Sequence, residues 1–285
     1  MVELAIAAPG LQAELERPPF RSSTLPDGTC STLFYRFEPG YLVRFPGLAD
    51  FEVSEDGRAV VCHPAPETSE GTWRHLYINQ VLPLVLGKLG KMVFHASAVE
   101  LDGSTLAFVA ESSGGKSTLA ASFATAGAAM VTDESLVLDE QAGGYRVAPG
   151  HRSVRLWEDS EHALIAPGAV AAPALPFTSK RRLLAARRLR FSRRPTRLRR
   201  MYFLGDGSAD TVTLEPLDPK VVLIELVKAS FLLSVDDRAR LATHFDALAK
   251  LSRRPIHYRL DYPRRFDLLP DVRRSILEHA RQALG

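Results

Sequence analysis

The sequence is poor in cysteine and has no long apolar run. Its two cysteines, Cys30 and Cys62, show no metal-ligand spacing, so we expect neither a disulfide framework nor a cysteine-bound metal. No stretch approaches eighteen consecutive apolar residues, which argues against a transmembrane helix. The first twenty residues contain early acids and no basic region, so we expect no signal peptide. These absences favour a cytoplasmic protein without a membrane partner.

What is present is typical of an ordinary globular protein. Of 285 residues, 46% are apolar and 24% charged, and the length allows one large domain or a domain with an appendage. The net charge of +3 is unevenly distributed. Residues 180–200 contain eleven Lys or Arg and no acid, which leaves 25 basic residues against 33 acidic ones elsewhere. A positive field confined to one segment suggests a local partner.

The hydrophobic patterns predict both strands and helices. We expect β-structure from Thr32 to Pro64, with strands separated at Pro39-Gly40, Pro46-Gly47 and Asp56-Gly57, the last a hairpin turn. An apolar helix over 72–89, which Pro83 kinks, should follow. The following patterns predict strands over 92–101 and 105–110, a helix over 116–126, and a short strand that ends at Thr132-Asp133-Glu134. The last third predicts a β-hairpin over 201–217 and three helices: one capped by Asp218 with Pro219 at its first position, one over 235–250 capped by Ser234, and one over 270–283.

The stretch after the strand expected over 105–110 gives the strongest indication of a function. Gly114-Gly115-Lys116-Ser117 lies between an apolar strand and a helix-forming run. In a phosphate-binding loop, backbone N–H groups face the phosphates, the lysine adds positive charge and the serine hydroxyl can reach Mg²⁺. Ala110 replaces the first glycine of the full pattern, and the alternative is a glycine turn before a helix with an exposed lysine. The residues predicted to bind a nucleotide are Ser112, Ser113, Gly114, Gly115, Lys116, Ser117 and Thr118.

Two acids and a histidine flank this loop in the sequence. Asp133 and Glu134 end the next predicted strand, where one carboxylate can accept a proton from an attacking hydroxyl and the other can help to hold Mg²⁺. The alternative is a solvated strand end. His95 lies on the strand before the loop, where a lone histidine is usually structural.

Together these residues resemble the catalytic domain of HPr kinase/phosphorylase. The resemblance rests on four features: HASAV from His95, an Asp-Gly hairpin, FVAESSGGKST and VTDE. It covers about residues 71–156. The chain resembles especially the shorter HPr-kinase-related proteins that lack the enzyme's own N-terminal domain. It implies that His95, with Lys116, stabilises charge on the transferred phosphate and that Asp133 is the base for a substrate serine. It also implies that Ser117 and Glu134 hold the metal, with Glu134 in place of the usual second Asp.

The resemblance also implies a fold. That fold is an α/β fold of the HPr kinase and phosphoenolpyruvate carboxykinase type, a P-loop kinase with a mixed twisted sheet. On this basis we divide the chain into a β-rich N-terminal region, residues 1–70, and a catalytic domain, residues 71–285. The family's second signature, a Glu-(Ile/Leu)-Arg-Gly-Leu-Gly-Ile-Ile-like run, is replaced by PGHRSVRLWEDS. This departure leaves one metal ligand unassigned and weighs against both the reverse phosphorylase reaction and HPr as the substrate.

The basic run at 180–200 has three interpretations. It is a surface loop that keeps the protein soluble, a clamp for the nucleotide or an acidic peptide, or a nucleic-acid site. Nucleic acid has the least support, because Phe191 is the only aromatic residue in the run. The candidate phosphate or substrate contacts, each of which could instead be an exposed charge, are Arg152, Arg155, Lys180, Arg181 and Arg182.

We therefore predict an ATP- and Mg²⁺-dependent kinase that phosphorylates a serine of a peptide or small protein. Related stand-alone kinases occur beside biosynthetic genes for ribosomal peptides such as lasso peptides, so a peptide precursor is one example of an acceptor. The alternatives are a nucleotide-binding regulator without kinase activity, associated with nucleic acid through residues 180–200, and a small-molecule kinase. The family's tendency to assemble implies a homo-oligomer, although no residue of this chain indicates one.

Overall fold

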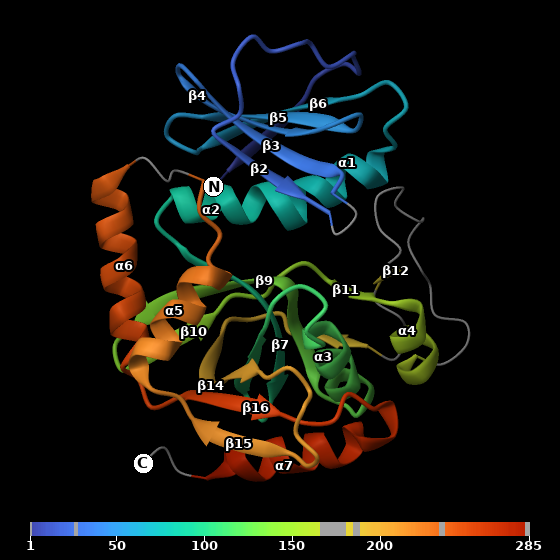
Figure 1. Ribbon diagram of the computed structural model, residues 1–285, viewed down its shortest axis with the longest axis vertical. Helices are drawn as coiled ribbons and strands as arrows, with labels where there is room; N and C mark the ends of the chain where they lie inside the picture. Colours follow the sequence, from blue (N-terminus) through green and yellow to red (C-terminus); the bar gives the residue numbers. More distant parts are fainter. Residues whose placement is uncertain (1, 26–27, 166–180, 185–188, 234–236, 283–285) are drawn as a thin grey trace. The chain divides into compact units, whose positions relative to one another are not determined.

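The chain forms two compact units (Figure 1). The computed structural model describes residues 2–25, 28–165, 181–184, 189–233 and 237–282. The first unit comprises Met1–Gly90 with Leu232–Ser234, and the second comprises Lys91–Phe231 with Val235–Gly285. The boundary predicted after residue 70 falls inside the first unit. The segment that follows residue 70 belongs to the N-terminal sheet, because the Tyr77 ring stacks on Phe51 with centroids 6.3 Å apart.

The first unit is built on a six-stranded sheet. The strands are β1 (Glu3–Ile6), β2 (Arg21–Thr24), β3 (Cys30–Phe37), β4 (Gly40–Phe45), β5 (Ala49–Ser54) and β6 (Ala59–Pro64), in the order β1-β6-β5-β4-β3-β2. All neighbours are antiparallel except β1 and β6. The β-structure predicted from Thr32 to Pro64 is confirmed. Its Asp-Gly turn works as expected, since Gly57 has a φ of +73° that an L side chain rarely adopts.

The helix expected over 72–89 is divided into three parts. α1 (Glu70–Leu76) is followed by a π-helical turn, η1 (Tyr77–Val81), and then by α2 (Leu82–Lys88). Pro83 lies in the first turn of α2 and has no N–H to donate to the preceding π turn. The wider π turn directly before it accommodates the ring, so the irregularity expected from Pro83 lies N-terminal to the proline.

A mixed eight-stranded sheet forms the centre of the second unit. The strands of its main path are β7 (Met92–Leu101), β8 (Ser104–Val109), β9 (Ala129–Gln141), β10 (Gly144–Val147), β14 (Thr196–Leu204), β15 (Thr213–Pro216) and β16 (His257–Asp261), in the order β10-β9-β7-β8-β14-β16-β15. β13 (Arg190–Phe191) pairs with β9, and β10 also pairs with the start of β14. Strands β8, β14 and β16 run parallel, whereas β7 is antiparallel to both of its neighbours. The prediction of an α/β fold with a mixed sheet is thus confirmed.

Helices pack on both faces of this sheet (Figure 1). α3 (Lys116–Thr125) and α7 (Leu269–Arg281) bury their apolar residues on one face, and α5 (Pro219–Ala229) and α6 (Arg238–Ser252) do so on the other. Strand alternation separates the two cores: Phe108 of β8 contributes to the α3 side and Ala107 to the α5 side. Two further elements contact α3: the short helix α4 (Glu158–Leu164) and the strand β11 (Ser153–Leu156). β11 pairs with β12 (Arg181–Leu184) in a separate two-stranded sheet. No helix in the described ranges is long and apolar enough to span a membrane.

Three local predictions are wrong in informative ways. The strand expected to end at Glu134 continues to Gln141, because the alternating residues after Glu134 pair with β7 and β10. The hairpin expected over 201–217 does not form, since β16 lies between β14 and β15. Asp237, rather than Ser234, caps α6 by accepting a hydrogen bond from the Arg240 amide, and Ser234 lies outside the described residues. The cap of α5 by Asp218 is confirmed.

His257 at the start of β16 should make the second unit sensitive to acid. Burial lowers the pKa of this imidazole from 6.5 to about 4, and Nδ1 donates to the Arg254 carbonyl at 2.9 Å. An unfolded chain gains this proton below pH 6.5 and the folded chain only near pH 4, so stability is lost as the pH falls through this window. The full loss is roughly 3 kcal/mol. Denaturant unfolding of His257→Gln at pH 7 and pH 4 should show a correspondingly smaller pH difference, and His162→Gln, at an exposed position, should not.

Candidate functional site

The glycine turn between β8 and α3 forms an anion-binding geometry. Gly115 is the N-cap of α3 with a φ of +88°, and it has no side chain to cap the helix. The first amides of an α-helix have no acceptor within the helix, so they can donate to a ligand. Gly114 turns the chain through a hydrogen bond from its N–H to the Glu111 carbonyl at 3.1 Å. Ser113 also has a positive φ, +65°. The helix dipole and these amides together favour a negative charge at this point.

Lys116 is folded over the loop. Its side chain is 5% exposed, and its Nζ donates to the carbonyls of Ala110 at 2.8 Å and Glu111 at 2.9 Å. Carbonyl oxygens are neutral acceptors, and a phosphate oxygen would be a stronger one for the same ammonium. The lysine is therefore held beside the place where the amides of α3 converge, with its charge available to an anion.

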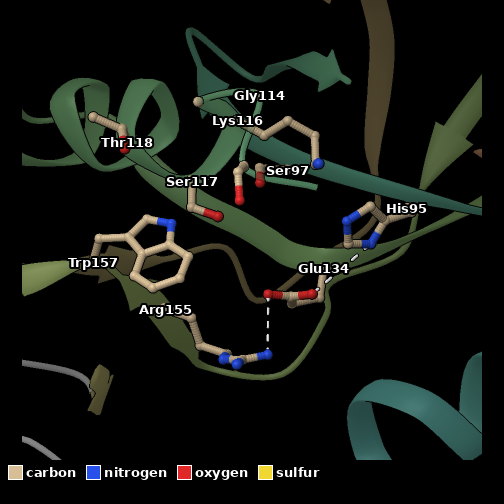
Figure 2. Close-up of a pocket in the computed structure, with 11 residues that line it drawn as sticks. His95, Ser97, Gly114, Lys116, Ser117, Thr118, Glu134, Arg155 and Trp157 are labelled. Atoms are coloured by element: carbon tan, nitrogen blue, oxygen red, sulfur yellow. Dashed lines mark hydrogen bonds and ion pairs between the residues drawn. The ribbon is translucent and has the colours of Figure 1, made fainter. Parts of the chain in front are cut away.

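A pocket opens beside this loop in the second unit (Figure 2). Residues of the loop and of the first turn of α3 form one wall, and the rest comes from strands β7, β9 and β11 and from Trp157, which follows β11. The lining residues are His95, Ser97, Ser113, Gly114, Gly115, Lys116, Ser117, Thr118, Glu134, Arg155 and Trp157. The pocket thus combines three basic side chains (His95, Lys116 and Arg155), hydroxyl groups and a carboxylate.

Asp133 lies behind the pocket wall and is held by several donors. Ser97 Oγ donates to its Oδ1 at 2.6 Å, the Arg155 amide donates to its Oδ2 at 2.8 Å, and the Ser117 hydroxyl also hydrogen-bonds to it. Burial, followed by the negative charge of Glu134, raises the pKa of the Asp133 carboxyl, and the three hydrogen bonds partly oppose that shift. These bonds link β7, β9, β11 and the first turn of α3 through one side chain.

Glu134 faces the pocket although it follows Asp133 directly. Consecutive side chains of a regular strand point to opposite faces, but Glu134 has a φ of +108°, which departs from β-geometry. Its Oε1 is 3.4 Å from the Arg155 guanidinium, and its Oε2 is 3.8 Å from Nδ1 of His95 (Figure 2). The irregular backbone therefore allows both acids to reach the same side of the sheet.

Comparisons with known proteins find similarity among solved structures rather than among sequences. No known family model and no curated protein matches the sequence. Among solved structures, the chain is similar to the HPr(Ser) kinase/phosphatase from Coxiella burnetii, with 10% identity over 66% of this chain and 97% of that one. The TM-score is 0.31, which is too low to transfer the role of any residue.

Most of the predicted site residues meet in the pocket. The loop from Ser113 to Thr118, His95, Glu134 and Arg155 all line it, whereas Ser112 is an exposed loop residue outside the lining. Asp133 contacts three lining residues, Ser97, Ser117 and Arg155, without lining the pocket itself.

The remaining basic candidates have different positions. The Arg152 guanidinium packs over the Phe191 ring, 5.7 Å from its centroid, and does not line the pocket. Arg182 of β12 pairs with Arg155 of β11 through the backbone, which places Arg181 and Arg182 on the strand next to the pocket. Lys180 lies outside the described residues. At the other end of the run, Arg200 is 1% exposed in β14, so the run is not one continuous solvated surface.

Sequence reasoning missed three features of this site. Ser97 lies two residues after His95 on one strand, and the strand period alone could have placed it on the same face. Trp157 lines the pocket but follows no recognisable motif. Arg264 stacks on Tyr262, 4.2 Å from the ring centroid, and both side chains lie within 4 Å of the place a Cβ on Gly115 would occupy. The last two placements depend on tertiary packing and have no local signal.

The oxygen donors around the loop suit Mg²⁺. The Ser117 hydroxyl and the Asp133 and Glu134 carboxylates are hard ligands of the kind that Mg²⁺ prefers. Within the described residues, no group of three or more His, Cys, Asp or Glu side chains could hold a metal.

Gly114 should tolerate no side chain as long as residue 110 is alanine. A Cβ on Gly114 would lie 2.7 Å from the Ala110 Cβ and 3.1 Å from the Glu111 carbonyl oxygen. We expect Gly114→Ala to lower the free energy of unfolding of the second unit by roughly 1–3 kcal/mol. Adding Ala110→Gly should recover part of that loss, because it removes the closer contact. Denaturant unfolding of both single variants and the double variant measures this coupling, and strictly additive losses would contradict it.

Proposed function

We propose that this protein is a kinase that uses ATP and Mg²⁺ to phosphorylate a serine hydroxyl of a peptide or small protein. The observation that carries the proposal is the single pocket that joins the α3 N-terminus, Lys116 and Glu134. A helix N-terminus with a buried lysine suits phosphates, and a carboxylate in the same pocket suits a proton that leaves an attacking hydroxyl. Phosphoryl transfer needs little more than such positioning and electrostatic stabilisation.

In the proposed reaction the acceptor oxygen forms a bond to the terminal phosphorus, and the bond from that phosphorus to the bridging oxygen breaks. ADP leaves with the bonding electrons, and the hydroxyl proton passes to the Glu134 carboxylate. Arg155 orients this carboxylate through the 3.4 Å contact. Lys116 and His95, which line the pocket on the same side as Glu134, stabilise the charge on the transferred group (Figure 2).

This division of roles is the opposite of the one that the family resemblance implied for the two acids. Both oxygens of Asp133 already accept hydrogen bonds, and the carboxylate lies behind Ser97 and Ser117. Glu134 lines the pocket and can approach an acceptor. We therefore propose Glu134 as the base and Asp133, together with Ser117, as the group that holds Mg²⁺. When bound, Mg²⁺ offsets the charge of the phosphate oxygens.

The acceptor class rests on the sequence resemblance to HPr-kinase-related proteins. Nothing in the pocket lining selects a serine over another hydroxyl, so a small-molecule alcohol is the alternative acceptor. Mass spectrometry of candidate peptides and small alcohols after incubation with labelled ATP distinguishes the two.

Lys116→Ala should remove phosphate binding while leaving the fold intact. The side chain donates to two loop carbonyls, and it belongs to the first residue of α3. We expect kcat/KM for ATP-dependent transfer to fall by about 100-fold or more. Lys91→Ala is a matched control, because Lys91 is half exposed and pairs with Asp139 at 2.6 Å away from the pocket lining. Transfer by Lys116→Ala at the unaltered rate would refute the proposed function.

Substituting the two acids separately should distinguish their roles. Glu134→Gln should keep ATP and Mg²⁺ binding but reduce kcat by about 10²–10⁴-fold, the range for loss of a general base. Asp133→Asn should instead raise the Mg²⁺ concentration needed for half-maximal rate. Initial rates over a matrix of ATP and Mg²⁺ concentrations separate these effects. The reverse pattern would restore Asp133 as the base and Glu134 as the metal ligand.

A further inference from the structure

An indole side chain lines one end of the pocket. Trp157, between β11 and α4, is 40% exposed and is the single aromatic residue among the described residues that line the pocket. In Figure 2 it lies beside Ser117 and Thr118, on the opposite side of the pocket from His95 and Glu134. The pocket therefore has an aromatic end and a charged end.

The position of Trp157 is fixed from both sides in the sequence. Two residues earlier, the Arg155 amide donates to Asp133 and its guanidinium contacts Glu134. Three residues later, Ser160 Oγ is 3.0 Å from Thr118 Oγ1 in the first turn of α3. These contacts tie the indole to the loop on which the phosphates are proposed to bind, so it is pre-organised next to Thr118.

The distribution of charge gives the bound triphosphate a direction. Lys116, His95 and Glu134 lie together, and these are the groups to which the transferred phosphate and the acceptor were assigned. Around Trp157, Figure 2 shows the Ser117 and Thr118 hydroxyls, and the indole face suits the uncharged base of a nucleotide rather than its phosphates. A purine presents a flat π-face that stacks on an aromatic side chain.

We infer that Trp157 is a nucleobase-binding residue and that the base stacks on its indole. The inference rests on the proposed function, since it takes the loop to hold the phosphates. Stacking contacts the π-face of the base and not its hydrogen-bonding edges, in which adenine and guanine differ. ATP and GTP should therefore bind with similar Kd. The competing occupant of this end is the acceptor peptide.

The experiment compares a nucleotide with a ligand that has the same phosphates and no base. Calorimetry should show that Trp157→Ala weakens MgATP binding roughly tenfold, the scale of one lost base–aromatic stack. Binding of magnesium tripolyphosphate should be unchanged. Trp157→Phe should retain most of the affinity for ATP. Phe245→Ala is the matched control, because Phe245 is an exposed aromatic of α6, 51% exposed, that does not line the pocket.

Fluorescence provides a second measurement on the same site. The chain has two tryptophans, and the other, Trp73, is buried in the first unit. In a Trp73→Phe background, ATP should quench the emission of Trp157 and tripolyphosphate should not.

Three outcomes would overturn the inference. Equal weakening of ATP and tripolyphosphate by Trp157→Ala would show a general effect on the loop. Unchanged ATP affinity in Trp157→Ala would show that the base does not stack on the indole. A raised KM for the acceptor alone would show that Trp157 binds the acceptor instead. In each case the wild-type protein still binds tripolyphosphate, so the proposed function stands. Failure of the wild-type protein to bind either ligand would instead reject both.

Discussion

The second unit depends on the way Arg155 holds two adjacent carboxylates. Asp133 and Glu134 are both less than 9% exposed, and two buried negative charges side by side would be costly without donors. Arg155 supplies its backbone N–H to one and its guanidinium to the other. Ser97 adds a further donor at 2.6 Å. Three strands and the start of α3 thus meet at one polar network. Displacing any one of its members would leave a buried polar group without its hydrogen-bond partner.

The same network accounts for the irregular backbone at Glu134. A positive φ at a non-glycine residue costs roughly 1–3 kcal/mol and persists only where the surroundings determine it. Here the β9 ladder continues on both sides, with Asp133 opposite Ser97 and Ser135 opposite His95. The strand cannot relax around Glu134 without breaking these pairs. The sequence pattern did not predict that β9 continues to Gln141. This continuation fixes the backbone after Glu134 and so helps to hold its side chain in the pocket.

Local signals made much of this site predictable, whereas its tertiary relations were not. The glycine turn before α3, the Asp-Gly hairpin before β8 and the Asp218 cap each depend on a few adjacent residues, and each formed as expected. The insertion of β16 between β14 and β15 depends on pairing between distant segments, which periodicity does not encode. Charge clustering was equally ambiguous: Arg200 belongs to the basic run, yet it is 1% exposed beneath α7, where it donates to the Gln282 carbonyl.

Charge balance in the pocket connects the proposed roles. Its cationic side chains already have acceptors, since Lys116 donates to two loop carbonyls and Arg155 contacts Glu134. A triphosphate would bring several more negative charges next to two carboxylates, and one lysine does not offset them. The proposed Mg²⁺ dependence follows from this deficit, because a divalent cation held by Ser117 and Asp133 would supply the missing positive charge. A nucleobase carries no charge and needs no such compensation, so it is assigned to the aromatic side chain of Trp157.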